Sequence, residues 1–163
     1  MIKFIFKLGF YLSLVLLFGA CQSLARKDLA WYPVSRVVDG DTFIIDDGSE
    51  KGKRVRLIGV DTPETVHPRK PVEYYGREAS DYVKNLLANQ RIGLEFDVDT
   101  TDRYGRLLAY VYLQDGTFLN AHLIEKGYGQ IATYPPNVKY VEKFQKLQRK
   151  ARRKNLGLWG KEE

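Results

Sequence analysis

The sequence has little cysteine, little histidine and only one long apolar run, and each shortage argues against a particular class of fold or site. Its 163 residues include one cysteine, Cys21, so a framework of internal disulfides is excluded. The two histidines, His67 and His122, are too few and too far apart to indicate a zinc site, and we expect both to be structural or to face solvent. We find no internal repeat and no low-complexity tract. The chain is long enough for one ordinary domain and one small additional segment.

The apolar run, Leu8–Ala20, lies near the N-terminus behind the basic residues Lys3 and Lys7. As a helix its 13 residues would span roughly 20 Å, which is short of the roughly 30 Å hydrocarbon core of a bilayer. The run therefore predicts an export signal rather than a membrane span.

Two processing sites fit this signal. Leu17–Cys21 resembles a bacterial lipobox, in which a cysteine after small residues is lipidated and becomes the new N-terminus, although Phe18 stands where an aliphatic residue is preferred. The alternative is ordinary cleavage after Ala25, because Ser23 and Ala25 are small residues at the two required positions. The absence of a disulfide partner for Cys21 favours lipidation.

These features predict a signal peptide over residues 1–20, a lipidated cysteine with a short tether over residues 21–32, and a folded domain over residues 33–160. We expect an exported protein that a lipid anchors to the bacterial cell envelope, or that is otherwise secreted or periplasmic. Nothing in the sequence calls for more than a monomer.

Positive charge is concentrated near the C-terminus. The chain has a formal net charge of +6, and residues 139–154 contain eight lysines and arginines against a single acid, Glu142. Such a run is most often a solvated helix face, and it can also attract polyanions. Docking to a membrane surface is the rival interpretation, but the apolar positions are too few and scattered for an inserting helix.

Hydrophobic patterning predicts five strands and three helices. The strands are expected at Val34–Val38, Thr42–Asp46, Arg54–Val60, Arg91–Val98 and Leu107–Leu113, and the helices at Gly76–Asn89, Phe118–Lys126 and Val138–Lys154. Residues 128–134 are expected to be irregular or extended, and residues 155–159 to fold back as an apolar anchor. This order of elements indicates a small α+β domain.

Charged residues follow the apolar strand that contains Arg56, at Asp61-Thr62-Pro63-Glu64. Taken alone, Thr62-Pro63-Glu64 is also a good helix start. Asp39-Gly40-Asp41 upstream adds carboxylates, and Asp102–Arg106 downstream adds an arginine. If the three stretches meet, two or three acids and two arginines surround one pocket, which is the composition of a metal-assisted phosphodiester-cleaving site.

In this order, four motifs resemble the staphylococcal nuclease, or thermonuclease, family. They are Val38–Thr42, Arg56–Glu64, Gly76–Ser80 and Thr101–Arg106. The resemblance covers roughly residues 35–159, and the loop between the second and third motifs is similar as well. It implies a five-stranded OB-fold barrel capped by about three helices, a scaffold often used to bind single-stranded nucleic acid.

The resemblance also implies a calcium site. Asp41 and Asp61 would be carboxylate ligands, and the Thr62 carbonyl would be a third protein ligand. The sequence itself indicates only a hard cation with oxygen ligands. Asp39 lies before Gly40, where a role in the turn is favoured over metal binding.

The remaining implied roles concern catalysis and substrate binding. Glu64 would be the general base or would orient the attacking water, and Arg56 and Arg106 would stabilise the phosphate as its charge develops. Lys70 and Tyr104 would bind substrate.

The chain departs from the family pattern after the short helix. The family usually carries two tyrosines, two residues apart, that stack a base and contact phosphate. An alignment without gaps places Thr133 and Pro135 at the positions of these two tyrosines. After a local shift, Tyr134 takes the position of one of the two family tyrosines.

The predicted function is a calcium-dependent endonuclease of low specificity that cleaves DNA and RNA, favours single strands and leaves 3′-phosphate ends. Weak base selectivity is expected because every residue assigned to the hydrolytic centre addresses phosphate or metal. The alternatives are a non-catalytic OB module that binds nucleic acid or protein, and a magnesium-dependent phosphatase or phospholipase at a membrane.

Overall fold

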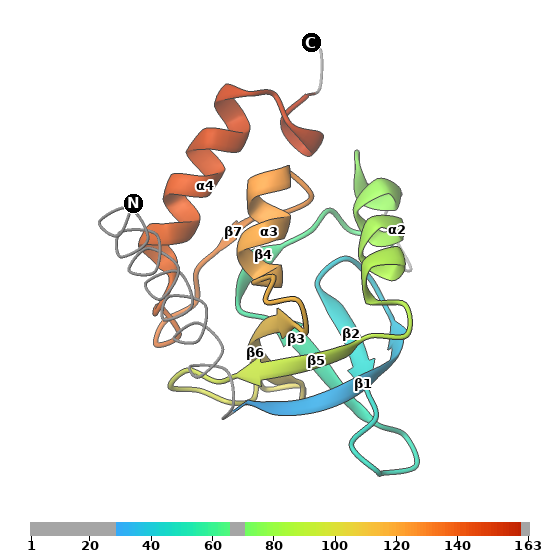
Figure 1. Cartoon of the computed structure of the whole chain (residues 1–163). Coiled ribbons are helices and arrows are strands. Elements are labelled where there is room, and N and C mark those ends of the chain that lie inside the picture. The colour runs from blue at the N-terminus through green and yellow to red at the C-terminus, as the bar shows by residue number, and fades with distance from the viewer. Residues whose placement is uncertain (1–28, 66–70, 161–163) are drawn as a thin grey trace, which may run out of the picture. The chain divides into compact units, whose positions relative to one another are not determined.

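The computed structural model describes residues 29–65 and 71–160, and the chain from Trp31 onward forms one compact unit. Five strands close into a barrel in the order β1-β2-β3-β6-β5, and two short strands, β4 and β7, form a separate sheet. The expected α+β fold with a five-stranded OB-fold barrel is confirmed (Figure 1). The strands are β1 (Ala30–Val37), β2 (Thr42–Ile45), β3 (Lys53–Leu57), β4 (Gly59–Asp61), β5 (Arg91–Glu95), β6 (Leu107–Leu113) and β7 (Gln130–Ala132).

Three α-helices accompany the barrel in the described residues, as expected: α2 (Gly76–Leu87), α3 (Leu119–Lys126) and α4 (Val141–Arg153). A short 3₁₀ helix, η1 (Gly157–Trp159), follows α4. None of the helices in residues 29–65 and 71–160 is both long and apolar enough to span a bilayer. The predicted signal peptide, Cys21, His67 and Lys70 lie outside the described residues.

The first strand begins earlier than expected. β1 starts at Ala30, so Trp31 and Tyr32, which the sequence placed in the tether, belong to the strand. The Arg91 guanidinium donates to the Trp31 carbonyl at 2.8 Å, and the Val34 amide donates to the Gln90 carbonyl at 3.0 Å. These bonds join the start of β1 to the start of β5.

The expected strand Arg54–Val60 is in fact two strands, because the chain changes direction at Gly59. This glycine has φ +75°, and a Cβ added there would lie 2.6 Å from the Phe144 ring of α4. Only glycine combines that backbone conformation with so close an approach by the helix. The break takes β4 out of the barrel and directs Asp61 toward a new sheet with β7.

A buried side chain holds α3 against this break. Asn120 is fully buried, its Oδ1 accepts the Val111 amide at 2.8 Å, and its Nδ2 donates to the Ile58 carbonyl at 2.8 Å. The amide thereby pairs backbone groups that the irregular strand end would otherwise leave buried without a partner. α3 ends at Lys126, as the sequence predicted, and Gly127 caps it in a left-handed conformation.

The C-terminal segment folds back as expected. Phe144 and Ala151 are buried on the inner face of α4. The Leu158 amide donates to the Gly127 carbonyl at 2.9 Å, and the Arg152 guanidinium lies 4.1 Å from the Trp159 ring. These contacts fix the end of α4 against the end of α3.

Candidate active site

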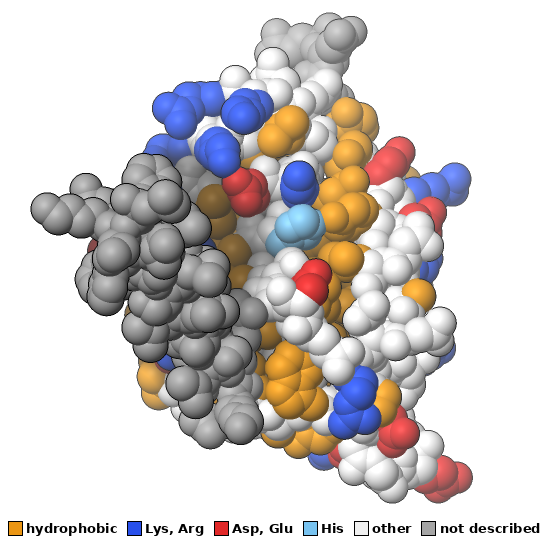
Figure 2. Space-filling view, viewed as in Figure 1, with side chains coloured by type: hydrophobic (Ala, Val, Ile, Leu, Met, Phe, Trp, Pro, Cys, Tyr) orange, Lys and Arg blue, Asp and Glu red, His pale blue; other side chains and the backbone are white. Residues whose placement is uncertain are grey.

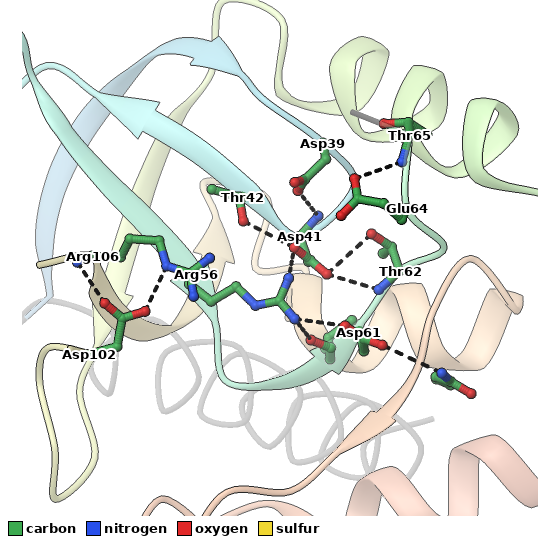
Figure 3. A network of polar contacts seen from close by, with 12 residues as sticks. Asp39, Asp41, Thr42, Arg56, Asp61, Thr62, Glu64, Thr65, Asp102 and Arg106 are labelled. Carbon is green, nitrogen blue, oxygen red and sulfur yellow. Dashed lines mark hydrogen bonds and ion pairs between the residues drawn. The ribbon is translucent and has the colours of Figure 1, made fainter. Parts of the chain in front are cut away.

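Arg56 lies at the centre of the candidate site. In the antiparallel pair of β2 and β3, Thr42 stands opposite Arg56, and the Leu57 amide donates to the Asp41 carbonyl at 3.0 Å. The Arg56 NH1 group forms an ion pair with Asp41, and its NH2 group bonds the Asp61 carboxylate at 2.9 Å (Figure 3). One guanidinium therefore joins two carboxylates that are 20 positions apart in the sequence.

Asp41 is held rigidly. Asp41 is only 2% exposed, and its Oδ2 accepts the Thr62 amide at 2.9 Å and the Thr62 hydroxyl at 3.2 Å. Its Oδ1 accepts the Thr42 hydroxyl at 3.1 Å. Gly40 allows Thr62 to come this close, because a Cβ at Gly40 would lie 2.7 Å from the Thr62 hydroxyl. The loop before β2 and the end of β4 are thus fixed to each other.

Asp61 is more accessible than Asp41, with a side chain that is 44% exposed. The pairing of β4 with β7 places Gln130 opposite Asp61, and Gln130 Nε2 donates to Asp61 Oδ2 at 3.5 Å. The sequence interpretation did not include Gln130, because residues 128–134 carry no pattern that predicts a strand beside β4.

Glu64 lies in a loop, and no helix begins at Thr62-Pro63-Glu64; α2 starts at Gly76. The Glu64 Oε1 atom accepts the Thr65 amide at 2.9 Å. The Glu64 backbone is fixed by Glu73, whose carboxylate accepts the Glu64 amide at 3.1 Å and whose amide donates to the Glu64 carbonyl at 3.0 Å. The loop that follows Glu64 is therefore closed at its base.

Asp39 has the turn role that the sequence favoured, because its Oδ1 accepts the Asp41 amide at 3.1 Å. It also contributes to the electrostatics of the site. Burial raises the pKa of the Asp39 carboxyl, and the nearby Arg56 charge and a hydrogen bond from Thr42 act in the opposite direction. Arg56 thus faces three carboxylates, two of them in direct contact.

Arg106 enters the site immediately before β6, which lies parallel to β3. Its Nε donates to Asp102 Oδ2 at 2.7 Å, and its backbone amide donates to Asp102 Oδ1 at 3.0 Å. Burial acts to raise the pKa of Asp102, but these bonds and one from the Tyr104 amide outweigh it and lower the pKa. Asp102 is thus an ionised clamp that holds the Arg106 side chain by one edge.

The two predicted substrate-binding tyrosines that the structure describes are both exposed. Tyr104 is 68% exposed, and its ring lies 5.5 Å from the Arg106 guanidinium. Tyr134 is 74% exposed and pairs with Asn137 in a tight turn. Asn137 in turn exchanges two 2.8 Å hydrogen bonds with the backbone of Asp99, which ties this turn to the connection between β5 and Arg106.

The donor set fits a hard divalent cation. Asp41 and Asp61 supply only oxygen, and they already converge on one positive group, the Arg56 guanidinium. Two carboxylates on one guanidinium leave negative charge in excess of what Arg56 neutralises, and a hard cation would balance it. The described residues contain no cluster of three or more His, Cys, Asp or Glu side chains that could hold a metal. A cation here would therefore depend on the two carboxylates and on a third ligand, for which the Thr62 carbonyl stays the expectation.

Comparisons with known proteins identify the family. The family model described as "Staphylococcal nuclease homologue" matches residues 54–161. A thermonuclease from Staphylococcus intermedius is 51% identical over 129 residues, which cover 78% of this chain and 75% of that protein. A thermonuclease from Staphylococcus hyicus is 48% identical over 137 residues, 83% of this chain and 79% of that protein. Endonuclease YncB of Bacillus subtilis is 40% identical over 146 residues, 88% of this chain and 68% of that protein.

The barrel, its helices and these relatives define a nuclease, an enzyme that hydrolyses phosphodiester bonds. The chain belongs to the staphylococcal nuclease family.

Proposed function

We propose that the chain is a calcium-dependent endonuclease of low sequence specificity that cleaves DNA and RNA and leaves 3′-phosphate ends. The observation that carries the proposal is the convergence of Asp41 and Asp61 on Arg56, with Glu64 in the loop directly after and Arg106 held by Asp102. The identity to thermonucleases supports the same activity.

Asp41, Asp61 and the Thr62 carbonyl would hold the cation, which would supply a Lewis acid for the phosphate. Calcium is the metal that the family resemblance implies, and hard oxygen donors suit it. Asp41 provides the rigid side of this site, because Thr42 and Thr62 fix both of its oxygens. Asp61 provides the accessible side.

Glu64 takes a proton from the attacking water, or orients that water, as the new bond to phosphorus forms. The Thr65 amide orients one carboxylate oxygen, and the contacts with Glu73 fix the backbone. Proton transfer by a positioned carboxylate contributes roughly 10²–10⁴ to rate.

Arg56 and Arg106 stabilise the charge that develops on the phosphate oxygens. Arg106 is preorganised for this role, because Asp102 occupies its Nε and leaves the two terminal nitrogens. Among the described residues, Asp102 is the one carboxylate that forms an ion pair with Arg106. Arg56 bonds both Asp41 and Asp61, and these two carboxylates fix its guanidinium beside the proposed cation site.

Substrate binding follows from exposed aromatic and basic groups. Tyr104 offers a ring face beside Arg103 and Arg106, and Tyr134 offers a second ring on the turn that Asn137 holds. Stacking on exposed rings requires unpaired bases, so single strands are favoured. Lys70 completes this proposed set.

The test of this function is the release of acid-soluble nucleotides from heat-denatured DNA by the purified protein. We expect release from the polymer and no release of phosphate from a small phosphomonoester. The reverse result would indicate a phosphatase, and tight binding of DNA without cleavage would indicate a binding module.

We further propose that the mature protein is exported and anchored to the cell envelope through a lipid on Cys21. The Cys21→Ser variant is expected to move from the membrane fraction to the soluble fraction, because the thioether can no longer form. Fractionation of expressing cells with an antibody to the chain measures this. A variant that stays in the membrane fraction would rule out the lipid anchor.

A further inference from the structure

The net positive charge of the chain is confined to one segment. Residues 139–154 carry eight basic side chains and one acid, which gives them a charge of +7, so the other 147 residues sum to −1 against the net +6 of the whole chain. This segment consists of α4 and the residues on either side of it. Figure 2 shows basic side chains gathered over the end of α4.

Part of this charge is neutralised and part is not. Lys139 pairs with Glu95 at 2.5 Å and Lys150 pairs with Glu125 at 2.6 Å. Five exposed cations of α4 form no ion pair with any described residue. Lys143 and Arg152 lie over the rings of Phe118 and Trp159, which leaves Lys146, Arg149 and Arg153 with neither an ion pair nor an aromatic partner in the described part of the chain. If this face of α4 served only the stability of the fold, more of its charges would be expected to form ion pairs, because unpaired neighbours of like sign repel one another.

The unpaired cations share a concave surface. A shallow groove of about 420 Å³ is lined by Lys146, Arg149, Arg152 and Arg153. A second hollow of about 460 Å³ adjoins it through Lys146 and extends along the helix past Lys143 to Lys139. We call the surface that these two hollows form the α4 basic groove. It follows α4, whose 13 residues extend for roughly 20 Å.

The helix that bears the α4 basic groove is linked to the candidate site through one strand. Gln148 of α4 accepts the Ile131 amide of β7 at 2.8 Å. The next residue of β7, Gln130, stands opposite Asp61 and bonds its carboxylate. β7 therefore contacts Asp61 through Gln130 and α4 through Gln148, so one short strand lies between the candidate site and α4.

We propose that the α4 basic groove is a second binding surface for the substrate, which holds the backbone of a single-stranded polynucleotide outside the hydrolytic centre. This rests on the nuclease activity and deepens it. Three unpaired cations contact phosphates without reading bases, so the groove contributes affinity and no sequence preference. A membrane surface fits less well, because Phe144 and Ala151 of α4 are buried in the domain and its other two apolar residues, Val141 and Leu147, are partly buried, so the helix has no exposed apolar face to insert.

The test uses a triple variant, Lys146→Gln, Arg149→Gln and Arg153→Gln, of the full chain. Its matched control loses three charges from the β2–β3 hairpin, through Lys51→Gln, Lys53→Gln and Arg54→Gln. This hairpin projects away from α4 (Figure 1). Each protein is assayed on long heat-denatured DNA and on a four-nucleotide single strand, over a range of salt concentrations.

For the long substrate we expect the triple variant to raise KM roughly tenfold in 0.1 M salt with kcat unchanged, and we expect no change on the tetranucleotide. The loss of three phosphate contacts should make the fall of log affinity with log salt less steep, by about 2 in the slope. When salt rises from 50 to 200 mM, the ratio of the triple variant's KM to the wild-type KM is therefore expected to fall about 20-fold. The control should retain the slope of the wild type.

Equal KM and equal salt slope in wild type and triple variant would overturn the proposal. So would an equal loss in the hairpin control, which would show only a general charge effect. If the wild type sediments with anionic vesicles and the triple variant does not, while cleavage is unchanged, the groove is a membrane contact. If the wild type cleaves neither substrate, the proposed function fails, which is distinct from these outcomes.

Discussion

Glu64→Gln is expected to lower kcat by roughly 10²–10⁴ and to leave KM within about threefold of the wild type. Glutamine retains the shape of the side chain, and its carbonyl can still accept the Thr65 amide, so the loop should keep its conformation. What is lost is the ability to take a proton from water. The measurement is steady-state hydrolysis of heat-denatured DNA with saturating calcium.

Glu50→Gln is the matched control for this variant. Glu50 is exposed in the loop between β2 and β3, and the same loss of one negative charge there should change kcat by less than about twofold. Comparable losses in kcat and in affinity for Glu64→Gln would contradict the general-base role, since they would indicate that Glu64 mainly binds substrate.

Arg106→Lys is expected to lower kcat by roughly 10²–10³, nearly as much as loss of the charge. The guanidinium uses its Nε for Asp102 and presents two further nitrogens, whereas a lysine has one nitrogen and cannot make both contacts. The lysine ammonium is expected to pair with Asp102 and to withdraw from the phosphate. Single-turnover cleavage of a labelled oligonucleotide separates this effect on chemistry from any effect on product release.

Arg103→Lys provides the control in the same loop. Arg103 is exposed and contacts Tyr104, so its replacement should change the rate constant only a few-fold. If Arg106→Lys retained the rate of the wild type, the planar two-nitrogen geometry would be unnecessary, and the role proposed for Asp102 would also be wrong.

Much of the barrel could be predicted from the sequence, because its strands and helices carry clear periodic patterns. The strand at Leu107–Leu113 and the helix that ends before Gly127 have the expected limits within one residue. The break at Gly59 could not be predicted, since it depends on the Phe144 ring, which is distant in the sequence. The short strand β7 could not be predicted either, because its three residues gain their conformation by pairing with β4.

The candidate site shows the same division. The sequence placed Asp41, Arg56 and Asp61 together, and the structure brings them into direct contact. It did not predict that Asp102 clamps Arg106 or that Gln130 bonds Asp61, because both are pair contacts that depend on the folded geometry. The roles of these residues, the metal and the lipid anchor stay predictions that the experiments above address.

The metal dependence of DNA cleavage tests the central claim most directly. Purified protein is incubated with heat-denatured DNA in the presence of Ca²⁺, of Mg²⁺ or of a chelator, and acid-soluble nucleotides are measured. The proposed site predicts release with Ca²⁺, little release with Mg²⁺ and none with chelator, because the paired carboxylates Asp41 and Asp61 serve catalysis only through a bound cation. Release that continues unchanged in chelator, or folded protein that binds DNA and does not cut it under any of these conditions, would contradict the proposal.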